Sequence, residues 1–286
     1  MIGRFFSKLS FYSAMFSFLI LSGIFAVLAL YAWESMSTFG LDFLTNSEWR
    51  VGKDDEGGVF GGLIPIVGTL LSTLIAMLIA TPIAIGIAIF LTEVAPQFLI
   101  KPVSIAVELL AAIPSIIYGM WGLFYLAPIM QELFGGSGIG LFTAGVVLAI
   151  MIIPFMAAIT RDSMNTTPDV LKESAYAMGA TKFEVIKDVV IPYAKIGIIG
   201  SVILALGRAM GETMAVAFLI GSVFHYPQKL TDATTSIPVV LANNFAEAID
   251  LELSSMFYLA LILFFISFTI IFVAKFYFLR EVKHAA

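Results

Sequence analysis

Long apolar stretches separated by shorter polar segments dominate the sequence. Six stretches are long enough to cross a lipid bilayer as helices, since about 20 apolar residues span its hydrocarbon core. They cover residues 11–33, 63–91, 103–130, 141–160, 193–222 and 253–278. This pattern predicts an all-α, polytopic membrane protein with six transmembrane helices in one domain over residues 1–286.

The first apolar stretch follows basic residues near the N-terminus, which raises the alternative of a secretory signal peptide. At 23 residues, however, residues 11–33 exceed the apolar core of a typical signal peptide. The stretch also ends in Tyr31 and Trp33, residue types that favour the membrane interface. We therefore interpret it as the first span.

The composition agrees with a membrane protein. Hydrophobic residues make up 60% of the 286 residues, charged residues only 12%, and the mean hydropathy is +1.02. The absence of cysteine excludes disulfides and cysteine nucleophiles, and two distant histidines, His225 and His284, argue against a histidine metal cluster. The sequence also lacks a G-x-x-x-x-G-K-[ST] loop and intramembrane protease motifs, so we expect no ATP hydrolysis, no bound cofactor and no nucleic-acid partner for this chain itself.

The basic residues predict how the spans are oriented, because cytoplasmic loops are enriched in Lys and Arg. Six spans place both termini on one side of the membrane. If that side is the cytoplasm, only Arg50, Lys53 and Lys229 lie outside, in loops of residues 34–62 and 223–252. Eleven of the fifteen basic residues then lie inside or at the inner boundary: Arg4, Lys8, Lys101, Arg161, Lys172, Lys182, Lys187, Lys195, Lys275, Arg280 and Lys283. This bias predicts cytoplasmic termini and a cytoplasmic loop of residues 161–192.

The charged loop of residues 161–192 contains the signals of two short helices. Thr167, followed by Pro168 and an acid, predicts the start of the first helix with the Thr167 hydroxyl as its cap. Gly179 predicts its end. One side of this helix carries small and apolar residues that favour a protein partner: Val170, Leu171, Ser174, Ala175 and Met178.

The second helix is predicted by Thr181 and Glu184, which have the spacing of a capping box. Pro192 is expected to end this helix or to kink it where the next span begins.

Glu173, Ser174, Ala175, Gly179 and Pro192 have the spacing of the EAA loop, the cytoplasmic coupling loop of ABC importer permeases, which this segment resembles. Ser174 replaces the usual alanine. The resemblance implies that these residues couple the membrane domain to a cytoplasmic ATPase. The alternative is a pair of amphipathic helices in an ordinary membrane-protein loop.

Arg208 and Glu212 are two charged residues in the fifth predicted span. Their spacing of four residues predicts that both lie on the same face of a helix, beside Gly207 and Gly211. An ionised side chain at the membrane centre costs roughly 2.5 to 3.5 kcal/mol, so both charges need partners or a watery cavity. One interpretation is an ion pair that fixes helix packing. The other is a translocation site, in which the Arg208 guanidinium binds an oxyanion. Glu212 would then position the guanidinium and lower its affinity for the anion.

Glu108 is a third intramembrane charge, in the third predicted span. It either approaches a translocation pathway or is a protonated or interfacial acid, and the sequence alone favours the second interpretation.

Residues 111–124 and 207–216, together with residues 60–69, resemble the permeases of phosphate importers, and the PstC type more than the PstA type. The resemblance covers most of the chain from about residue 39 onward. It implies a type I ABC importer permease bundle with cytoplasmic coupling helices, in a bacterial or archaeal cytoplasmic membrane. It also implies a PstA-like permease partner, two PstB-like ATPase subunits that carry ATP and Mg²⁺, and an external phosphate-binding protein.

Two other classes of transport protein remain open from the residues alone. A permease for sulfate, molybdate or phosphonate would keep the coupling loop and differ at the anion site. A secondary transporter would work without an ATPase.

Overall fold

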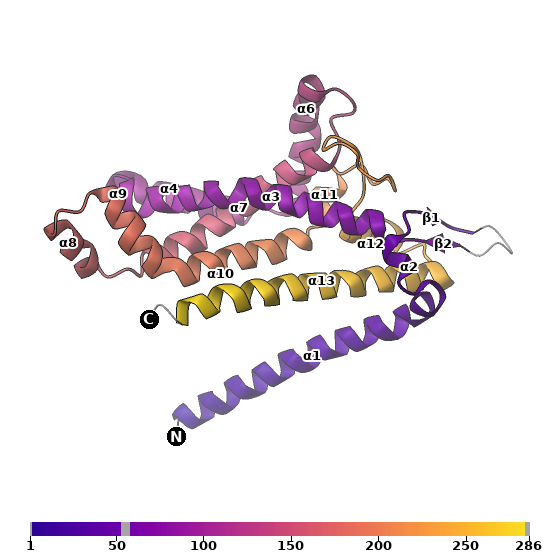
Figure 1. Cartoon of the computed structure of the whole chain (residues 1–286), viewed down its shortest axis with the longest axis horizontal. Helices are drawn as coiled ribbons and strands as arrows, with labels where there is room; N and C mark the ends of the chain where they lie inside the picture. Colours follow the sequence, from indigo (N-terminus) through magenta and orange to yellow (C-terminus); the bar gives the residue numbers. More distant parts are fainter. Residues whose placement is uncertain (1, 53–57, 284–286) are drawn as a thin grey trace. The chain divides into compact units, whose positions relative to one another are not determined.

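The computed structural model describes residues 2–52 and 58–283, and most of this part is helical (Figure 1). Lys53 and His284 lie outside the described residues, as do the side chains of Arg4, Arg280 and Lys283. The chain divides into two compact units, Met1–Leu63 with Val240–Phe265 and Ile64–Val239 with Ile266–Ala286.

The first unit combines the N-terminal helix with the first half of the C-terminal helix. Its elements are α1 (Ile2–Phe39), α2 (Asp42–Thr45), the strands β1 (Trp49–Arg50) and β2 (Val59–Phe60), and the start of α13 (Asp250–Lys283). Serine hydroxyls join α1 to α13. The Ser35 N–H donates to Ser254 Oγ at 3.0 Å, and Ser254 Oγ donates to the Tyr31 carbonyl at 2.8 Å. The Ser254 hydroxyl thus bonds both the Ser35 N–H and the Tyr31 carbonyl, which lie one turn apart in α1. Each of these polar groups therefore has a hydrogen-bond partner in an apolar setting.

The predicted outer loop of residues 34–62 has an ordered aromatic core. Phe43 is fully buried, and its ring centroid lies 4.5 Å from that of Tyr258. The Tyr258 hydroxyl donates to the Gly40 carbonyl at 3.1 Å. β1 and β2 pair antiparallel, with Trp49 opposite Phe60 and their rings 5.1 Å apart. Burial of these rings gives the segment a fixed structure next to the strands.

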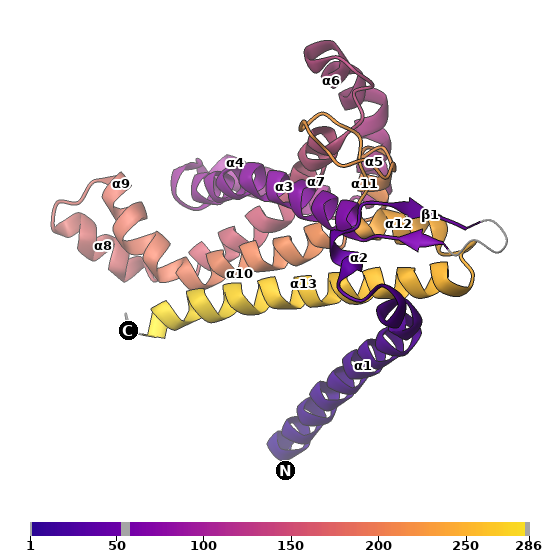
Figure 2. The ribbon, with the colours of Figure 1, turned by 45° about the vertical axis from the view of Figure 1, so that its right-hand side comes forward.

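The second unit is a bundle of helices around α7. Its elements are α3 (Leu63–Ile89), η1 (Phe90–Val94), α4 (Gln97–Ala111), α5 (Ser115–Trp121), η2 (Gly122–Leu126), α6 (Ala127–Phe134), α7 (Leu141–Met164), α8 (Asp169–Ala177), α9 (Lys182–Val185), η3 (Ile186–Val190), α10 (Ile191–Met210) and α11 (Met214–Ala217). The short helix α12 (Ile237–Asn244) begins in this unit. α7 is the most buried candidate span, and α4 and α10 pack against it (Figures 1 and 2).

α7 and α10 approach closely because small and hydroxyl side chains face each other. A Cβ added at Gly197 would collide with the Ser163 side chain. The Ser163 hydroxyl bonds the Ala194 carbonyl at 3.2 Å, and the hydroxyls of Thr160 and Ser201 lie 2.8 Å apart. Small residues and hydroxyl hydrogen bonds are the usual means of joining helices within a bilayer.

Three π-helical turns, η1, η2 and η3, each end two residues before a proline: Pro96, Pro128 and Pro192. A proline lacks the backbone N–H and its ring crowds the carbonyl four residues earlier. The wider turn moves the preceding hydrogen bond to the residue five positions back, as the Ile191 N–H to Ile186 carbonyl bond illustrates.

Within residues 2–52 and 58–283, five helices have the length and apolar character of membrane spans, and a bent pair of helices makes a sixth if the two form one span. The five are Phe6–Phe39, Leu63–Val94, Leu141–Met164, Lys182–Met210 and Asp250–Phe276. The predicted third span over residues 103–130 corresponds to two helices, Gln97–Ala111 and Ser115–Phe134, which meet at 91°. Pro114 lies at the break and cannot continue the helix.

Two other predicted boundaries also need correction. α7 continues to Met164, so Arg161 belongs to its last turn and does not open the loop. The fifth predicted span ends at Met210 instead of residue 222, because the chain leaves the helix at Gly211 and then forms only the short α11.

Candidate functional site

The loop predicted to couple to an ATPase forms a helix, α8, that begins one residue later than its sequence signal suggests. Pro168 caps it in an extended conformation. The predicted Thr167 cap is therefore wrong, and the buried Thr167 hydroxyl has no hydrogen-bond partner within the described part of the chain. Gly179 follows the helix with φ of +90°, a conformation that glycine adopts without strain.

The second predicted helix, α9, is confirmed together with its capping box. The Thr181 N–H donates to Glu184 Oε2 at 2.7 Å, and the Glu184 N–H donates to Thr181 Oγ1 at 3.4 Å. Pro192 does not end this helix. It lies in the first turn of α10, and the π-helical turn η3 joins α9 to α10 (Figure 1).

The two sides of α8 have different surroundings. Ala175 is buried in a small core with Ala88, Met164 and Val185. Of the small and apolar residues predicted to lie on one side of this helix, only Ala175 faces this core. The others are exposed, and Glu173 is exposed as well. These exposed residues are Val170, Leu171, Ser174 and Met178.

An ion pair that the sequence analysis missed fastens α8 to the end of the second span. Lys172 Nζ lies 2.6 Å from Glu93 Oε1, and both side chains are largely withdrawn from solvent. The sequence shows Glu93 at the end of an apolar stretch and Lys172 in a charged loop, but nothing in it indicates that the two meet.

Arg208 lies in the last turn of α10, where its guanidinium faces an aromatic ring. Its Cζ is 5.4 Å from the centroid of Phe155, within the range of a cation–π interaction. The predicted pairing with Glu212 is wrong: among the described residues no ion pair involves Arg208.

Glu212 lies outside α10 because the helix ends before Gly211. Its Oε1 instead accepts a hydrogen bond from the Ala215 N–H at 3.2 Å, at the start of α11. The four-residue spacing therefore does not place the two charges on one helix face, and a pathway role for Glu212 stays a prediction.

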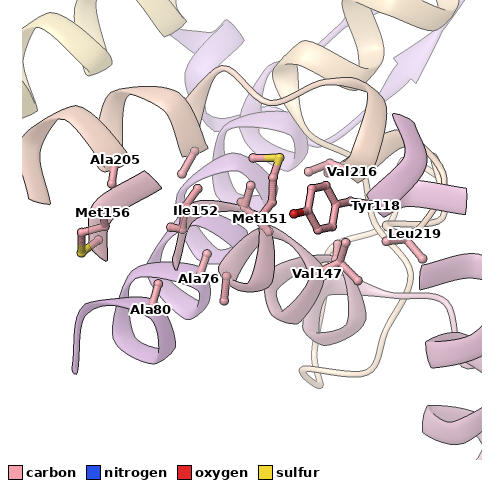
Figure 3. Close-up of a cluster of buried hydrophobic side chains, with 14 of the residues drawn as sticks. Ala76, Ala80, Tyr118, Val147, Met151, Ile152, Met156, Ala205, Val216 and Leu219 are labelled. Atoms are coloured by element: carbon pink, nitrogen blue, oxygen red, sulfur yellow. The ribbon is translucent and has the colours of Figure 1, made fainter. Parts of the chain in front are cut away.

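Two of the three segments that resemble phosphate-importer permeases, residues 111–124 and 207–216, pack against each other beside Tyr118. A Cβ at Gly119 would lie 3.0 Å from Ala215 Cα and 2.9 Å from the Phe218 ring, so α5 and α11 meet only because residue 119 has no side chain. Tyr118 packs close to Val147 and Val216 (Figure 3). The position of Tyr118, next to Gly119 in α5, thus depends on this contact.

Glu108 forms an ion pair with Arg161, Oε1 to Nη2 at 3.0 Å, and Asp162 binds the same guanidinium at 2.7 Å. The pair joins α4 to α7. It supplies the charge partner that an acid in an apolar helix requires. A place for Glu108 in a translocation pathway stays a prediction.

These features define a polytopic membrane protein with the architecture of a transport permease: a bundle of apolar helices, a helical segment joining two of them, and an intramembrane arginine. The chain belongs to the family of binding-protein-dependent transport system inner membrane components, whose model matches residues 58–283, and within it to the phosphate transport system permease proteins of the PstC type.

Similar proteins occur in both bacteria and archaea. The phosphate transport system permease protein PstC of Pasteurella multocida is 47% identical over 94% of this chain and 89% of its own length. The protein of the same name from Mesorhizobium japonicum is 47% identical over 94% of this chain and 87% of its own. The probable PstC of Methanocaldococcus jannaschii is 34% identical over 95% of both chains.

Solved ABC transporters share the fold. A chain of a bacterial alginate ABC transporter, crystallised with its periplasmic protein bound to an alginate pentasaccharide, superposes with a TM-score of 0.61. It is 15% identical and covers 94% of this chain and 95% of its own length. A chain of the inward-facing MetNI methionine transporter gives 0.60 at 20% identity, over 78% of this chain and 94% of its own.

Proposed function

We propose that this chain is the permease subunit of an ATP-driven importer of inorganic phosphate. The observation that carries the proposal is the 47% identity, over 94% of the chain, to a phosphate transport system permease protein. The other oxyanions, sulfate, molybdate and phosphonate, are not favoured, because the relatives that share most of this chain are named for phosphate transport. An ATP-independent transporter is not favoured by the ABC permease fold.

Arg208 is the residue we propose to meet the anion. A guanidinium that no described carboxylate neutralises carries an unsatisfied positive charge in an apolar helix, and a passing phosphate satisfies it. The Phe155 ring supports the cation through its face and leaves N–H donors for phosphate oxygens. The absence of a second ionic anchor keeps binding weak enough for release.

The exposed side of α8 is the surface we propose for the ATPase. Glu173 and Ser174 are exposed there beside Val170 and Met178. Apolar side chains on a surface outside the bilayer favour a protein partner. Two PstB-like subunits would hydrolyse ATP with Mg²⁺, and a PstA-like permease would form the other half of the pathway.

The orientation follows from the charges. Cytoplasmic termini place α8 and most Lys and Arg residues inside, as the positive-inside rule requires, in the cytoplasmic membrane of a bacterium or archaeon. The segments of residues 34–62 and 223–252 then face outward, where a phosphate-binding protein would dock.

Co-purification tests the proposal. The tagged chain is extracted in detergent, and the ATPase activity of the proteins that accompany it is measured with empty, phosphate-loaded and sulfate-loaded binding protein. We expect stimulation by the phosphate-loaded form alone. A chain that purifies without an ATPase, or stimulation that does not distinguish phosphate from sulfate, would overturn the proposal.

A further inference from the structure

The ion pair between Glu93 and Lys172 joins two elements that are 79 residues apart in the sequence. Glu93 belongs to the π-helical turn η1 that ends the second span, and Lys172 lies in the first half of α8. Their charged atoms are 2.6 Å apart, and the side chains keep only 8% and 18% of their solvent exposure.

Lys172 is withdrawn from solvent, although most residues of α8 are exposed. Lys172 and Ala175 are three positions apart, which places them on the same face, and both are withdrawn from solvent. Val170, Leu171 and Met178 are exposed. Because Lys172 belongs to α8, a displacement of this helix acts directly on the ion pair.

The ion pair gives α8 a connection that the polypeptide itself does not provide. The chain leads from α8 back to α7 and forward to α9, η3 and α10, and α8 also packs against α9 and η3. These routes reach the fourth and fifth spans. The bond from Lys172 to Glu93 leads to the end of α3, which α8 also approaches through the core shared by Ala175 and Ala88.

The chemistry of the pair suits a link that transmits movement. Two charges withdrawn from water attract each other strongly, and removing either one leaves the other without compensation. A lysine ammonium is a point charge on a flexible stem, so it can pivot about a carboxylate oxygen without losing the bond. Met164, which contacts Thr92 beside Glu93, belongs to the same buried core as Ala175 and supports the junction.

We infer that Glu93 and Lys172 are positioning residues that transmit movement of the coupling helix α8 to the second span. The inference rests on the proposed function, because it assumes that an ATPase moves α8. Coupling between distant sites requires a contiguous physical connection with two arrangements, and this pair supplies the connection between α8 and α3.

The test uses the complete complex in liposomes, with the phosphate taken up per ATP hydrolysed as the readout. Glu93→Gln and Lys172→Gln are each expected to lower this ratio by about tenfold, within the usual range of coupling between sites. The charge-swapped double variant Glu93→Lys with Lys172→Glu should recover most of it. The matched control is the exposed pair Lys187–Asp188, 3.7 Å apart, where Lys187→Gln and Asp188→Asn should change nothing.

A covalent bridge separates a mechanical link from a charge effect. The chain has no cysteine, so the double variant Glu93→Cys with Lys172→Cys offers the only two thiols of this subunit. Joining them with a flexible, cleavable bis-thiol reagent should raise the lowered ratio, and cleaving the reagent should lower it again.

Each outcome has a definite meaning. Single variants with the wild-type ratio overturn the inference, as do a charge swap and a bridged variant that assemble but stay uncoupled. If the single variants fail to assemble, the charge-swapped variant and the bridged cysteine variant decide whether the inference holds. Failure of the proposed function is distinct, because then the wild-type complex itself takes up no phosphate.

Discussion

The Tyr118 hydroxyl donates a hydrogen bond of 2.8 Å to the Leu110 carbonyl, across the break between α4 and α5. In a continuous helix that carbonyl would accept the N–H of residue 114, which here is a proline and has none. The Ile113 N–H donates to this carbonyl at 3.3 Å, and the Tyr118 hydroxyl adds a second, shorter hydrogen bond. Unpaired backbone groups are costly in an apolar setting, and this bond helps to make the 91° bend possible.

Tyr118→Phe should lower the stability of the protein by about 0.5–1.5 kcal/mol, because the Leu110 carbonyl then keeps only the longer hydrogen bond from the Ile113 N–H. The expected observation is a lower apparent Tm of the detergent-solubilised chain. Tyr125→Phe is the control, since Tyr125 is exposed and lies in the same bent span. Equal Tm values for the two variants would contradict the role given to Tyr118.

Gly197→Ala should destabilise the α7–α10 contact, because the added Cβ meets the Ser163 side chain and overpacking of this kind costs about 1–3 kcal/mol. Gly200→Ala, on the same helix, places its Cβ in open space and should be neutral or mildly stabilising. The Tm of both variants is measured under identical detergent conditions. A Gly197→Ala variant as stable as Gly200→Ala would show that the helices separate at little cost.

Those parts of the site that depend on a few neighbouring residues could be predicted from the sequence. The Thr181–Glu184 capping box and the positive φ of Gly179 are local, since the atoms involved lie within four residues of one another. The apolar stretches likewise indicated the helices, because length and hydrophobicity alone make a segment suited to a membrane. The predicted start of α8 was less accurate. The helix begins one residue later than predicted, so Pro168 and not Thr167 is its N-cap.

The remaining parts depend on contacts between distant residues or on where a helix stops. The link from Glu93 to Lys172 and the bond from Tyr118 to Leu110 follow from how helices pack and bend, which periodicity does not reveal. The expected pairing of Arg208 with Glu212 failed because it assumed a continuous helix through Gly211. A glycine can continue or end an apolar helix, and the surrounding packing decides which.

Gly179→Ala should impair coupling, because residue 179 has φ of +90° and alanine is strained there by about 1 kcal/mol. The strain acts on the turn between α8 and α9, so we expect less ATPase stimulation by phosphate-loaded binding protein, with assembly preserved. Gly179→Asn should retain more stimulation, since asparagine tolerates positive φ better. Gly135→Ala, strained alike at φ of +76° but outside this segment, is the control. An equal effect of both alanine variants would exclude a specific role for Gly179.

Arg208→Gln should lower phosphate uptake by about tenfold to a hundredfold, as expected when charged hydrogen bonds worth about 1.5–3 kcal/mol are lost. The complex should still assemble, because no described carboxylate depends on Arg208 for its charge partner. Uptake of labelled phosphate into liposomes and the yield of intact complex are measured together.

Two matched variants separate an anion site from a packing role for Arg208. Arg208→Lys keeps the charge but loses the planar fork, so its uptake should lie between wild type and Arg208→Gln. Glu212→Gln keeps an oxygen for the Ala215 N–H and should change uptake little, because Glu212 does not pair with Arg208. If Arg208→Gln instead dissociates the complex while any protein that remains assembled takes up phosphate normally, the guanidinium serves packing against Phe155 and the pathway lies elsewhere.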